Sequence, residues 1–424
     1  MPDLVAILSE PNRRRLLELL SGDEQTVSQL ASQFGVTRSA VSQHLGVLSN
    51  AGLVHARQEG RFRYYRLDPD GMAALRDALD VFWTHELEIL TSAHPSGTGE
   101  HVMTAEKSVL VPLDPDETFA LLTEPERLRR WQAVTARVEL RAGGQYRWTI
   151  SPGHTASGTI TEVEPGRRIV FTWGWEGSDD LPPGASTVTI TLEPAEGGTS
   201  VRLVHSGLTP EQAAGHLEGW NHYGDRLMLA AQYGDAGIDE WAAPKPGDPL
   251  TAAEASLAVC QAVLRGLKPE SGRLRTPCAK YDVDDLVEHL LGSIRSLGVA
   301  GGAMMPDPAG GPAEVRVAEA AQAALETWRK RGLEGTVNLG RSEVPATVVT
   351  DVLCMEFLVH AWDFARATQQ TITVDDALSS YVLERGRSLI APQMRDGDNF
   401  AAEIEVGPDA DSLTRLLAFT GRKT

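Results

Sequence analysis

Apolar residues recur at helical spacing in three short runs within the first fifty residues of the chain. In the last run, residues 38–50, Val41, Leu45 and Leu48 stand at i, i+4 and i+7, which predicts a helix with one buried face. Residues 54–67 then alternate between apolar and polar side chains, which predicts a two-stranded hairpin. The turn is predicted at Gln58, Glu59 and Gly60, and the buried side at Val54, Ala56, Phe62 and Tyr64. A helix followed by such a hairpin is typical of a winged helix-turn-helix.

The predicted helix and hairpin carry a local basic charge. Residues 27–66 hold five arginines against one acidic residue, a balance of +4 in a chain of formal net charge −19, so the remainder carries −23. A confined basic surface on an acidic protein indicates contact with double-stranded DNA. The alternative is a polar helix face that is merely solvated, and the arginines of the hairpin favour DNA. The predicted DNA-binding residues are Thr37, Arg38, Ser39, Ser42, Gln43, His44, Arg57, Arg61 and Arg63.

This N-terminal segment resembles the ArsR-type winged-helix regulators. The resemblance is carried by the stretches EPNRRRLLELL, VSQLA, VSQHLGVLSNAGLV and GRFRYYRL. It implies a homodimer in which the first helix and a last helix at residues 72–90 form the interface, so that two recognition helices face successive half-sites. Metal-sensing members carry cysteines on a helix of this domain, whereas the first cysteine here is Cys260. Metal sensing by the head is therefore not expected.

The middle of the chain is predicted to be an α+β domain. A strand and two helices are followed by six strands with tight turns and by one long helix, which predicts a helix-grip fold whose curved sheet encloses a cavity. This part resembles the activator-of-Hsp90-ATPase branch of the START-like (SRPBCC) superfamily, through TEPERLRRW, GGQYRW, GTITEVEPGRRIVFTWGW and HLEGWNHYGDRL. The superfamily includes ligand carriers, cyclases, hydrolases and chaperone cofactors, so the resemblance indicates the fold more strongly than the function.

Aromatic residues crowd the predicted strands of this domain and favour a pocket for a small apolar or aromatic ligand. The predicted pocket residues are Trp131, Tyr146, Trp148, Trp173, Trp175 and Trp220, with His154, His205 and His222 as polar candidates. Core packing is the alternative for each aromatic residue, and docking of a chaperone or another protein is the alternative for the domain. No nucleophile, base and orienting group can be assembled from the spacing, so no catalytic residue is assigned.

The last part of the chain returns to a helical pattern. The predicted helices of a four-helix bundle are residues 251–267, 283–299, 314–331 and 345–368. On the last of them, Glu356 and His360 lie one turn apart and share a face that Asp363 continues, while His289 lies on an earlier helix. Glu and His on facing helices suit Zn²⁺ or a similar divalent ion. An exposed ion pair is the alternative.

This bundle resembles the mycothiol-dependent maleylpyruvate isomerase group of DinB-like proteins, through TPCAKYDVDDLVEHLLGS, DVLCMEFLVHAWDFARATQQ and DADSLTRLLAFTGR. The resemblance implies that His289, Glu356 and His360 bind a divalent metal, with zinc preferred. The group usually has Pro-Gly-Trp after the cysteine that corresponds to Cys278, whereas Ala279-Lys280-Tyr281 stands there in this chain, so the approach to the site differs. Cys278 itself is interpreted as structural.

Length and composition set the outer limits of these predictions. A chain of 424 residues exceeds one hydrophobic core, and three domains are expected. The predicted ranges are 1–92 for the winged helix, 93–103 for a linker, 104–237 for the START-like domain, 238–249 for a second linker and 250–424 for the bundle. We find no membrane-spanning stretch and no secretory signal, and three scattered cysteines argue against a disulfide framework. A cytoplasmic protein without a membrane partner is expected.

The sequence therefore favours an ArsR-type transcriptional regulator that responds to a small molecule bound by the START-like domain. The alternative is a metal-dependent, thiol-using transferase or isomerase that carries a regulatory DNA-binding head. The sequence leaves open the ligand, the operator, the choice between repression and activation, the occupancy of the metal site and the identity of any thiol.

Overall fold

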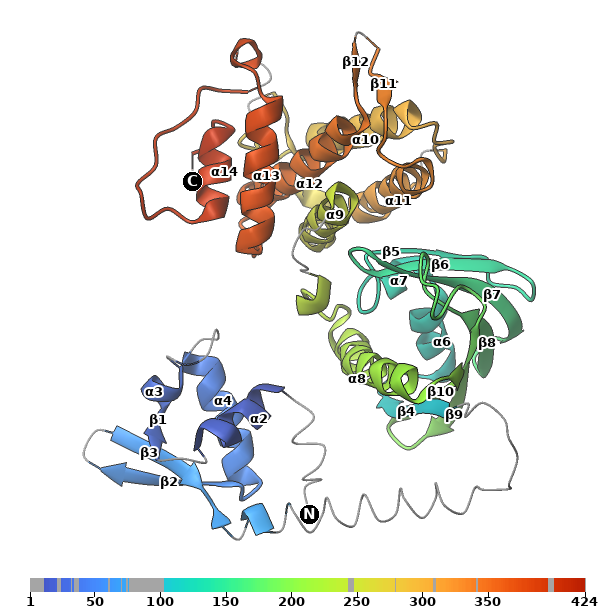
Figure 1. The fold of residues 1–424 in the computed structure, drawn as a ribbon, viewed down its shortest axis with the longest axis vertical. Helices are drawn as coiled ribbons and strands as arrows, with labels where there is room; N and C mark the ends of the chain where they lie inside the picture. The colour runs from blue at the N-terminus through green and yellow to red at the C-terminus, as the bar shows by residue number, and fades with distance from the viewer. Residues whose placement is uncertain are drawn as a thin grey trace. The chain divides into compact units, whose positions relative to one another are not determined.

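The computed structural model describes residues 11–20, 24–31, 33, 38–59, 62–69, 71–73, 75, 103–242, 248–278, 280–307, 310–340, 342–395 and 400–423 (Figure 1). The chain divides into two compact units, residues 1–100 and 101–424. No helix within the described ranges is long and apolar enough to cross a membrane. The predicted dimerisation helix at 72–90 and the predicted linker at 93–103 lie almost wholly outside these ranges.

The first unit packs short helices against a three-stranded sheet. Its elements are α2 (Pro11–Leu20), β1 (Gln25–Thr26), α3 (Val27–Ala31), α4 (Arg38–Asn50), β2 (Val54–Glu59) and β3 (Phe62–Leu67), with strand order β1-β3-β2. The predicted apolar stripe of α4 is confirmed, because Val41, Leu45 and Leu48 have no exposed surface. The start of α3 is a capping box, in which the Thr26 backbone donates to the Gln29 side chain at 2.8 Å and the Gln29 backbone donates to the Thr26 hydroxyl at 3.3 Å.

The register of the hairpin differs from the prediction. Glu59, a predicted turn residue, lies in β2 and pairs with Phe62, so the strands run further toward the tip. Ala56 pairs with Tyr65, which is buried, and the predicted placement of Tyr64 on that side is wrong. Because side chains alternate with a period of two, a connection that differs by one residue moves the second strand's side chains to the opposite face.

The second unit begins with a curved antiparallel sheet and a long helix. Its elements are β4 (Met103–Val111), α6 (Pro115–Thr123), α7 (Pro125–Leu128), β5 (Thr135–Val138), β6 (Gln145–Ser151), β7 (His154–Glu164), β8 (Arg168–Trp173), β9 (Ser186–Ala195), β10 (Gly198–Leu208) and α8 (Pro210–Tyr233). The strand order is β4-β10-β9-β8-β7-β6-β5, and the sheet curves around α6 and α8 (Figure 1). Thr209 and Gln212 form a capping box at the start of α8, and Gly234 ends it in the left-handed conformation. The predicted order of elements is confirmed.

Helices make up most of the rest of the second unit. They are α9 (Pro249–Arg265), α10 (Val283–Ala300), α11 (Ala313–Arg331), α12 (Ala346–Thr368), α13 (Asp376–Leu389) and α14 (Ser412–Phe419), with 3-10 turns at Glu240–Ala242, Pro269–Ser271 and Pro392–Met394 and a small hairpin of β11 (Thr336–Asn338) and β12 (Glu343–Pro345). The four predicted bundle helices are confirmed to within two residues. Asp248 and Asp282 start α9 and α10 by accepting backbone hydrogen bonds. Most of α12 is buried, so it is the central helix of this part.

Candidate functional site

The exposed face of α4 is the first candidate site. Ser42 and Gln43 are exposed and His44 is half-buried, opposite the apolar stripe of the helix. Gly46 is also exposed, and a Cβ atom built there would meet no atom within 4 Å. Glycine at this position is therefore not required by packing within the protein. Because Gly46 has no side chain, the exposed face of α4 would allow the backbone of a DNA duplex to come close at this position.

The wing presents arginines in two different ways. Arg63 is exposed, and its guanidinium lies 5.5 Å from the ring centre of Tyr65. Arg57 lies over Tyr64 at 5.3 Å and forms an ion pair with Glu24 at 2.5 Å, and the hydrogen bond from Arg57 lowers the pKa of that carboxyl. A phosphate must therefore compete with Glu24 for Arg57. The sequence did not predict a role for Glu24. This residue lies just outside the basic segment 27–66, and only the folded sheet brings it next to Arg57.

The side chains of the other predicted DNA-binding residues lie outside the described part of the structure. Arg38 and Ser39 lie in the first turn of α4, where only the backbone is described. Thr37 and Arg61 lie outside the described residues.

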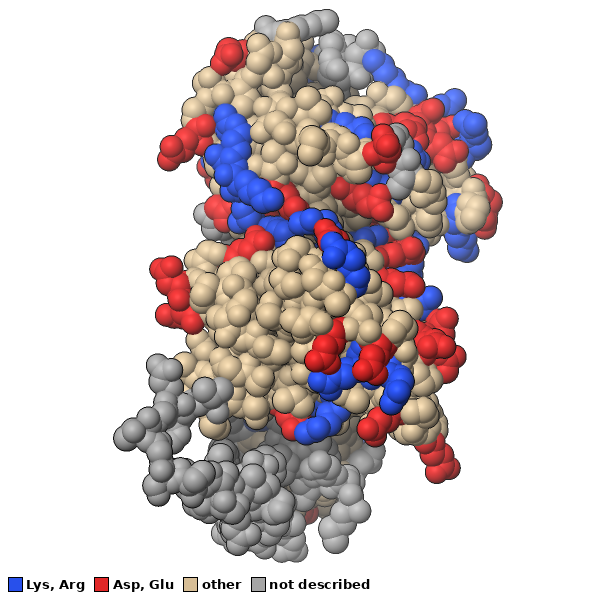
Figure 2. Space-filling view, turned by 90° about the vertical axis from the view of Figure 1, so that its right-hand side faces the viewer, with Lys and Arg blue, Asp and Glu red and all other residues tan. Residues whose placement is uncertain are grey.

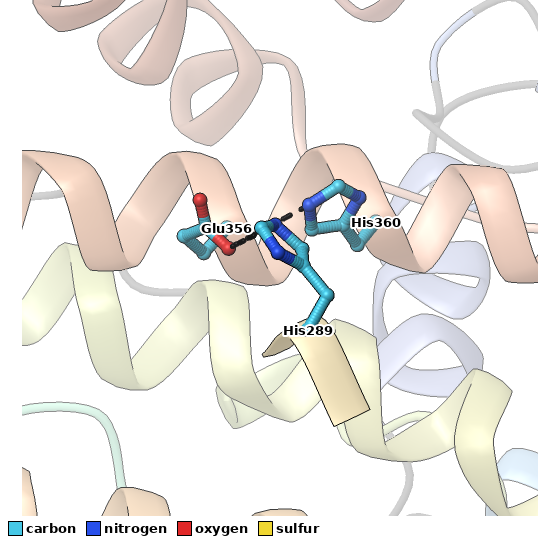
Figure 3. A group of neighbouring side chains, drawn as sticks. All are labelled: His289, Glu356 and His360. Atoms are coloured by element: carbon cyan, nitrogen blue, oxygen red, sulfur yellow. Dashed lines mark ion pairs between the residues drawn. The ribbon is translucent and has the colours of Figure 1, made fainter. Parts of the chain in front are cut away.

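The second candidate site lies where α10 meets α12 (Figure 3). The structure brings together the three predicted ligands, because one donor atom from each of His289, Glu356 and His360 lies within 4.8 Å of the others. The Oε2 atom of Glu356 is 3.5 Å from Nε2 of His289 and 3.6 Å from Nε2 of His360. Two ring nitrogens and one carboxylate oxygen thus face a common point.

This donor set fits a divalent ion. Oε2 of Glu356 is buried and has no hydrogen-bond partner in the described part of the chain, which is costly unless a cation or a donor satisfies it. Burial lowers the pKa of His289, which favours the neutral ring that metal binding needs. Burial opposes the charge on His360, but the hydrogen bond to Asp363 and the nearby carboxylate of Glu356 outweigh it and raise the pKa to about 9. An ion must therefore displace a proton from His360.

A second layer of contacts orients the site. Nδ1 of His360 lies 2.9 Å from Oδ2 of Asp363, and Arg422 donates to both oxygens of Asp363 at 2.8 and 2.7 Å. Tyr281 stacks on His289 with ring centres 4.9 Å apart. A carboxylate behind a histidine fixes its ring orientation and makes it a stronger ligand. Arg422 lies 59 residues from Asp363 in sequence, and no local pattern could have predicted the pair.

Cys278 lies near this site. The thiol is half-buried, and burial together with the charge of Asp363 raises its pKa. A raised pKa keeps the sulfur protonated near neutral pH, which agrees with a structural thiol and disfavours a nucleophile.

The predicted aromatic pocket is largely filled by its own side chains. Among the six predicted residues only Trp175 is half-buried, and the other five are at most 8% exposed. Ring centres of Tyr146 and Trp148 are 4.5 Å apart, and those of Trp173 and Trp220 are 5.3 Å apart. A cavity of about 40 Å³ remains between the sheet and α8, and its walls include Trp131, Trp148 and Trp220. That volume holds a few water molecules at most.

Polar atoms inside this aromatic cluster follow two patterns. Trp148 and Tyr223 belong to the cavity wall, and Nε1 of Trp148 and the hydroxyl of Tyr223 are buried with no partner among the described atoms. His205 is instead fully satisfied: Nδ1 accepts from Nε1 of Trp220 at 3.3 Å, and Nε2 lies 2.8 Å from the Ser186 hydroxyl, which donates to the Trp173 carbonyl. Burial and the nearby His216 lower the pKa of His205 to about 3, so the ring stays neutral.

The remaining polar candidates lie elsewhere. His154 is exposed. His222 pairs with Asp239 at 2.9 Å and stacks on Trp241 with ring centres 4.0 Å apart. Neither lines the small cavity.

We predict that His205 makes the second unit sensitive to acid. Below pH 6.5 the unfolded chain binds a proton that the folded His205 does not bind until about pH 3, so stability is highest above pH 6.5 and falls as the pH drops through this window. At pH 5 the loss from this residue is about 2 kcal/mol. Urea unfolding followed by tryptophan fluorescence at pH 7.5 and pH 5 should show a smaller loss in His205→Gln. The exposed His154→Gln serves as control, and an equal loss in both variants would contradict the assignment.

The fold and the exposed face of α4 define the first unit as a winged helix-turn-helix DNA-binding domain. The chain belongs to the arsR family of bacterial regulatory proteins. The model of that family, described as "Bacterial regulatory protein, arsR family", matches residues 10–56. Residues 112–231 match "Activator of Hsp90 ATPase homolog 1-like protein". The chain thus joins an arsR-family DNA-binding head to an activator-of-Hsp90-ATPase-like domain.

Individual proteins are similar to separate parts of this chain. The HTH-type transcriptional regulator Rv2034 of Mycobacterium tuberculosis is 49% identical over 80 residues, which are 19% of this chain and 75% of that protein. The protein named "Uncharacterized protein Rv0738" of the same organism is 32% identical over 178 residues, 41% of this chain and 98% of its own length. The solution structure of an AHSA1-like protein from Rhizobium etli is 39% identical, covers 35% of this chain and 92% of its own, and gives a TM-score of 0.29.

Proposed function

We propose that the protein is a dimeric transcriptional regulator whose affinity for its operator is set by a small uncharged molecule bound in the START-like domain. DNA binding is supported by the exposure of Ser42 and Gln43 on α4, on the face opposite a fully buried apolar stripe. The wing of the same unit adds an exposed arginine, Arg63. The dimer is taken from the resemblance to ArsR-type regulators.

The two parts of this surface have different tasks. Gln pairs with adenine and Ser with either partner of a base pair, so the α4 residues supply base readout in the major groove. Arginines of the wing bind phosphates, which adds affinity without sequence information. Because the rest of the chain carries −23, this affinity depends steeply on salt and on where the acidic parts lie.

Substitutions in α4 and in the wing should have different effects on DNA binding. With duplex DNA from the protein's own promoter region, Gln43→Ala should reduce discrimination between operator and scrambled duplex by about 1–3 kcal/mol. Arg63→Ala should weaken binding to both duplexes alike and reduce the salt slope by about 1. Fluorescence anisotropy at several salt concentrations measures both effects.

Arg141→Ala is the matched control, since it removes an exposed arginine from the second unit. If it weakens DNA binding as much as Arg63→Ala does, the wing has no specific role. Salt-insensitive binding by the unaltered protein would contradict the phosphate contacts altogether.

Ligand binding in the START-like domain is supported by the mainly apolar cavity wall, in which the indole nitrogen of Trp148 and the hydroxyl of Tyr223 have no hydrogen-bond partner among the described residues. The cavity of about 40 Å³ must widen to admit an aromatic molecule, and that change gives a ligand its differential affinity for two states. Coupling to the operator follows if only one of these states fits the spacing of the half-sites.

Acetophenone and ethylbenzene form a matched pair of probes for this cavity, because they differ by one carbonyl acceptor. Acetophenone should bind about fivefold more tightly, as one neutral hydrogen bond allows, and should shift the operator midpoint. Trp148→Phe should remove the preference, while Trp241→Phe, which alters a largely exposed indole, should retain it. Tryptophan fluorescence and anisotropy measure the two effects. Equal affinity of the unaltered protein for both probes would contradict the proposed contact.

A second candidate function is a metal-dependent transferase or isomerase that uses a thiol, and the convergence of His289, Glu356 and His360 favours it. A bound divalent ion would supply Lewis-acid activation at an open coordination position. The chain's own residues would hold that ion: Asp363 and Arg422 keep the His360 ring in place, and Tyr281 covers His289. This second candidate assumes that the helical bundle is related to the DinB-like proteins that it resembles in sequence.

Zinc titration of the metal-free protein by calorimetry tests this second candidate. The unaltered protein should bind one ion per chain, and His289→Ala and Glu356→Gln should abolish measurable binding. Arg422→Ala should weaken it by about 10–100-fold, because it frees the carboxylate behind His360. His222→Ala, which alters a histidine outside the site, should leave it unchanged. An affinity that is the same in all four variants would remove the metal site and the enzymatic candidate with it.

A further inference from the structure

A much larger cavity lies inside the second unit, between the part that contains the sheet and the part that contains the helices. Its volume is about 790 Å³, against about 40 Å³ for the cavity under the sheet. Its walls come from residues 129–134, from the end of α8 and the segment to Ala242, from α9 and from residues 370–375 after α12. This volume lies within the range of small-molecule pockets, which occur preferentially where domains meet.

The frame around this cavity is held by specific polar contacts. Arg129 donates to both carboxylate oxygens of Glu314 at 2.8 and 3.0 Å, and both side chains are 3% exposed. Across the same junction the Gly153 backbone donates to Glu254 at 2.7 Å, and Arg329 donates to that carboxylate as well. Two buried carboxylates of the helical part are thus bonded to the sheet part. These contacts link the two walls of the cavity, which is partly open to solvent near Tyr233 and Ile238.

The charges in the cavity wall balance and are largely used within the protein. Arg129 is committed to Glu314, Arg265 pairs with Asp235 at 2.5 Å, and Arg226 lies 3.7 Å from Asp239. The charged lining residues are four arginines and four acids: Arg129, Arg130, Arg226, Arg265, Asp235, Asp239, Glu240 and Asp375. On the outside, Figure 2 shows basic and acidic side chains interspersed where the two parts meet. Without a surplus of either sign, the wall favours an uncharged ligand.

Gln261 is a wall residue with a side-chain nitrogen that is unpaired among the described residues, and a small side-chain movement would present this nitrogen to a ligand. Gln261 on α9 is 2% exposed, and its Nε2 atom is buried without a hydrogen-bond partner among the described residues. An unsatisfied buried donor costs about 1–3 kcal/mol, which an acceptor in the cavity would recover. Around it the wall is aliphatic and aromatic, with Val259, Val263, Ile372 and Trp131 among the lining residues.

We propose that this interdomain cavity binds an uncharged, mainly apolar small molecule with a hydrogen-bond acceptor placed against Gln261. Such a molecule touches both parts of the second unit, so its binding stabilises their association. The proposal rests neither on DNA binding nor on the cavity under the sheet.

Nile red is a suitable probe because it is uncharged, largely apolar, carries a carbonyl acceptor and is too large for a cavity of about 40 Å³. Fluorescence titration of the full chain should show one saturable site. Ala258→Trp, which fills the cavity from α9, should weaken binding at least tenfold. Gln261→Leu, which keeps the volume and removes the donor, should weaken it about fivefold. Ala214→Trp is the control, since it adds the same side chain at an exposed position of α8 outside the cavity.

Unaltered Nile red binding in both Ala258→Trp and Gln261→Leu would overturn the proposal. So would loss of binding in Trp148→Phe with retention in Ala258→Trp, because that result places the probe under the sheet and leaves the proposed ligand site there intact. An anionic probe, 1-anilinonaphthalene-8-sulfonate, should bind at least tenfold more weakly than Nile red. Equal affinity for this anion would contradict an uncharged ligand. Gln261→Leu keeps the test valid if Ala258→Trp lowers the thermal stability of the chain.

Discussion

Buried carboxylates hold the second unit together, and one of them, Glu314 at the start of α11, pairs with Arg129 at the end of α7. Both charges are almost fully removed from water, and each is tolerable only because the other is present. Removing one member of such a pair typically costs about 3–5 kcal/mol, since it strands a charge in a medium of low polarity. The bidentate geometry also sets orientation. Together with the contact from the Gly153 backbone to Glu254, this pair links the sheet-bearing part to the helical part.

Buried charge also organises the centre of the helical part. Asp363 has no exposed side-chain surface, and burial alone would raise its pKa, but Arg422 and His360 lower it by hydrogen bonding to it. The same carboxylate orients the His360 ring toward Glu356 and His289. A residue two positions from the end of the chain thereby sets the geometry between two long helices. The orientation of the His360 ring consequently depends on the contact that Arg422 makes with Asp363.

The DNA-binding head is a small basic segment of an acidic chain. Its basic segment carries +4 and the remainder −23, so association with a polyanion is opposed by the protein's own charge. Within the head, Glu24 already occupies Arg57. Both features weaken non-specific attraction more than base contacts, which act at short range.

The sequence by itself determined the elements and the class of the protein. Apolar spacing predicted α4, the order of elements from β4 to α8, and the four bundle helices. These patterns depend on residues that are only a few positions apart. The shared face of Glu356 and His360 was predictable for the same reason. Only the tertiary structure decided the hairpin register, the filling of the aromatic cavity, the Arg422–Asp363 pair and the interdomain cavity with Gln261. Each depends on packing between segments that local periodicity does not relate.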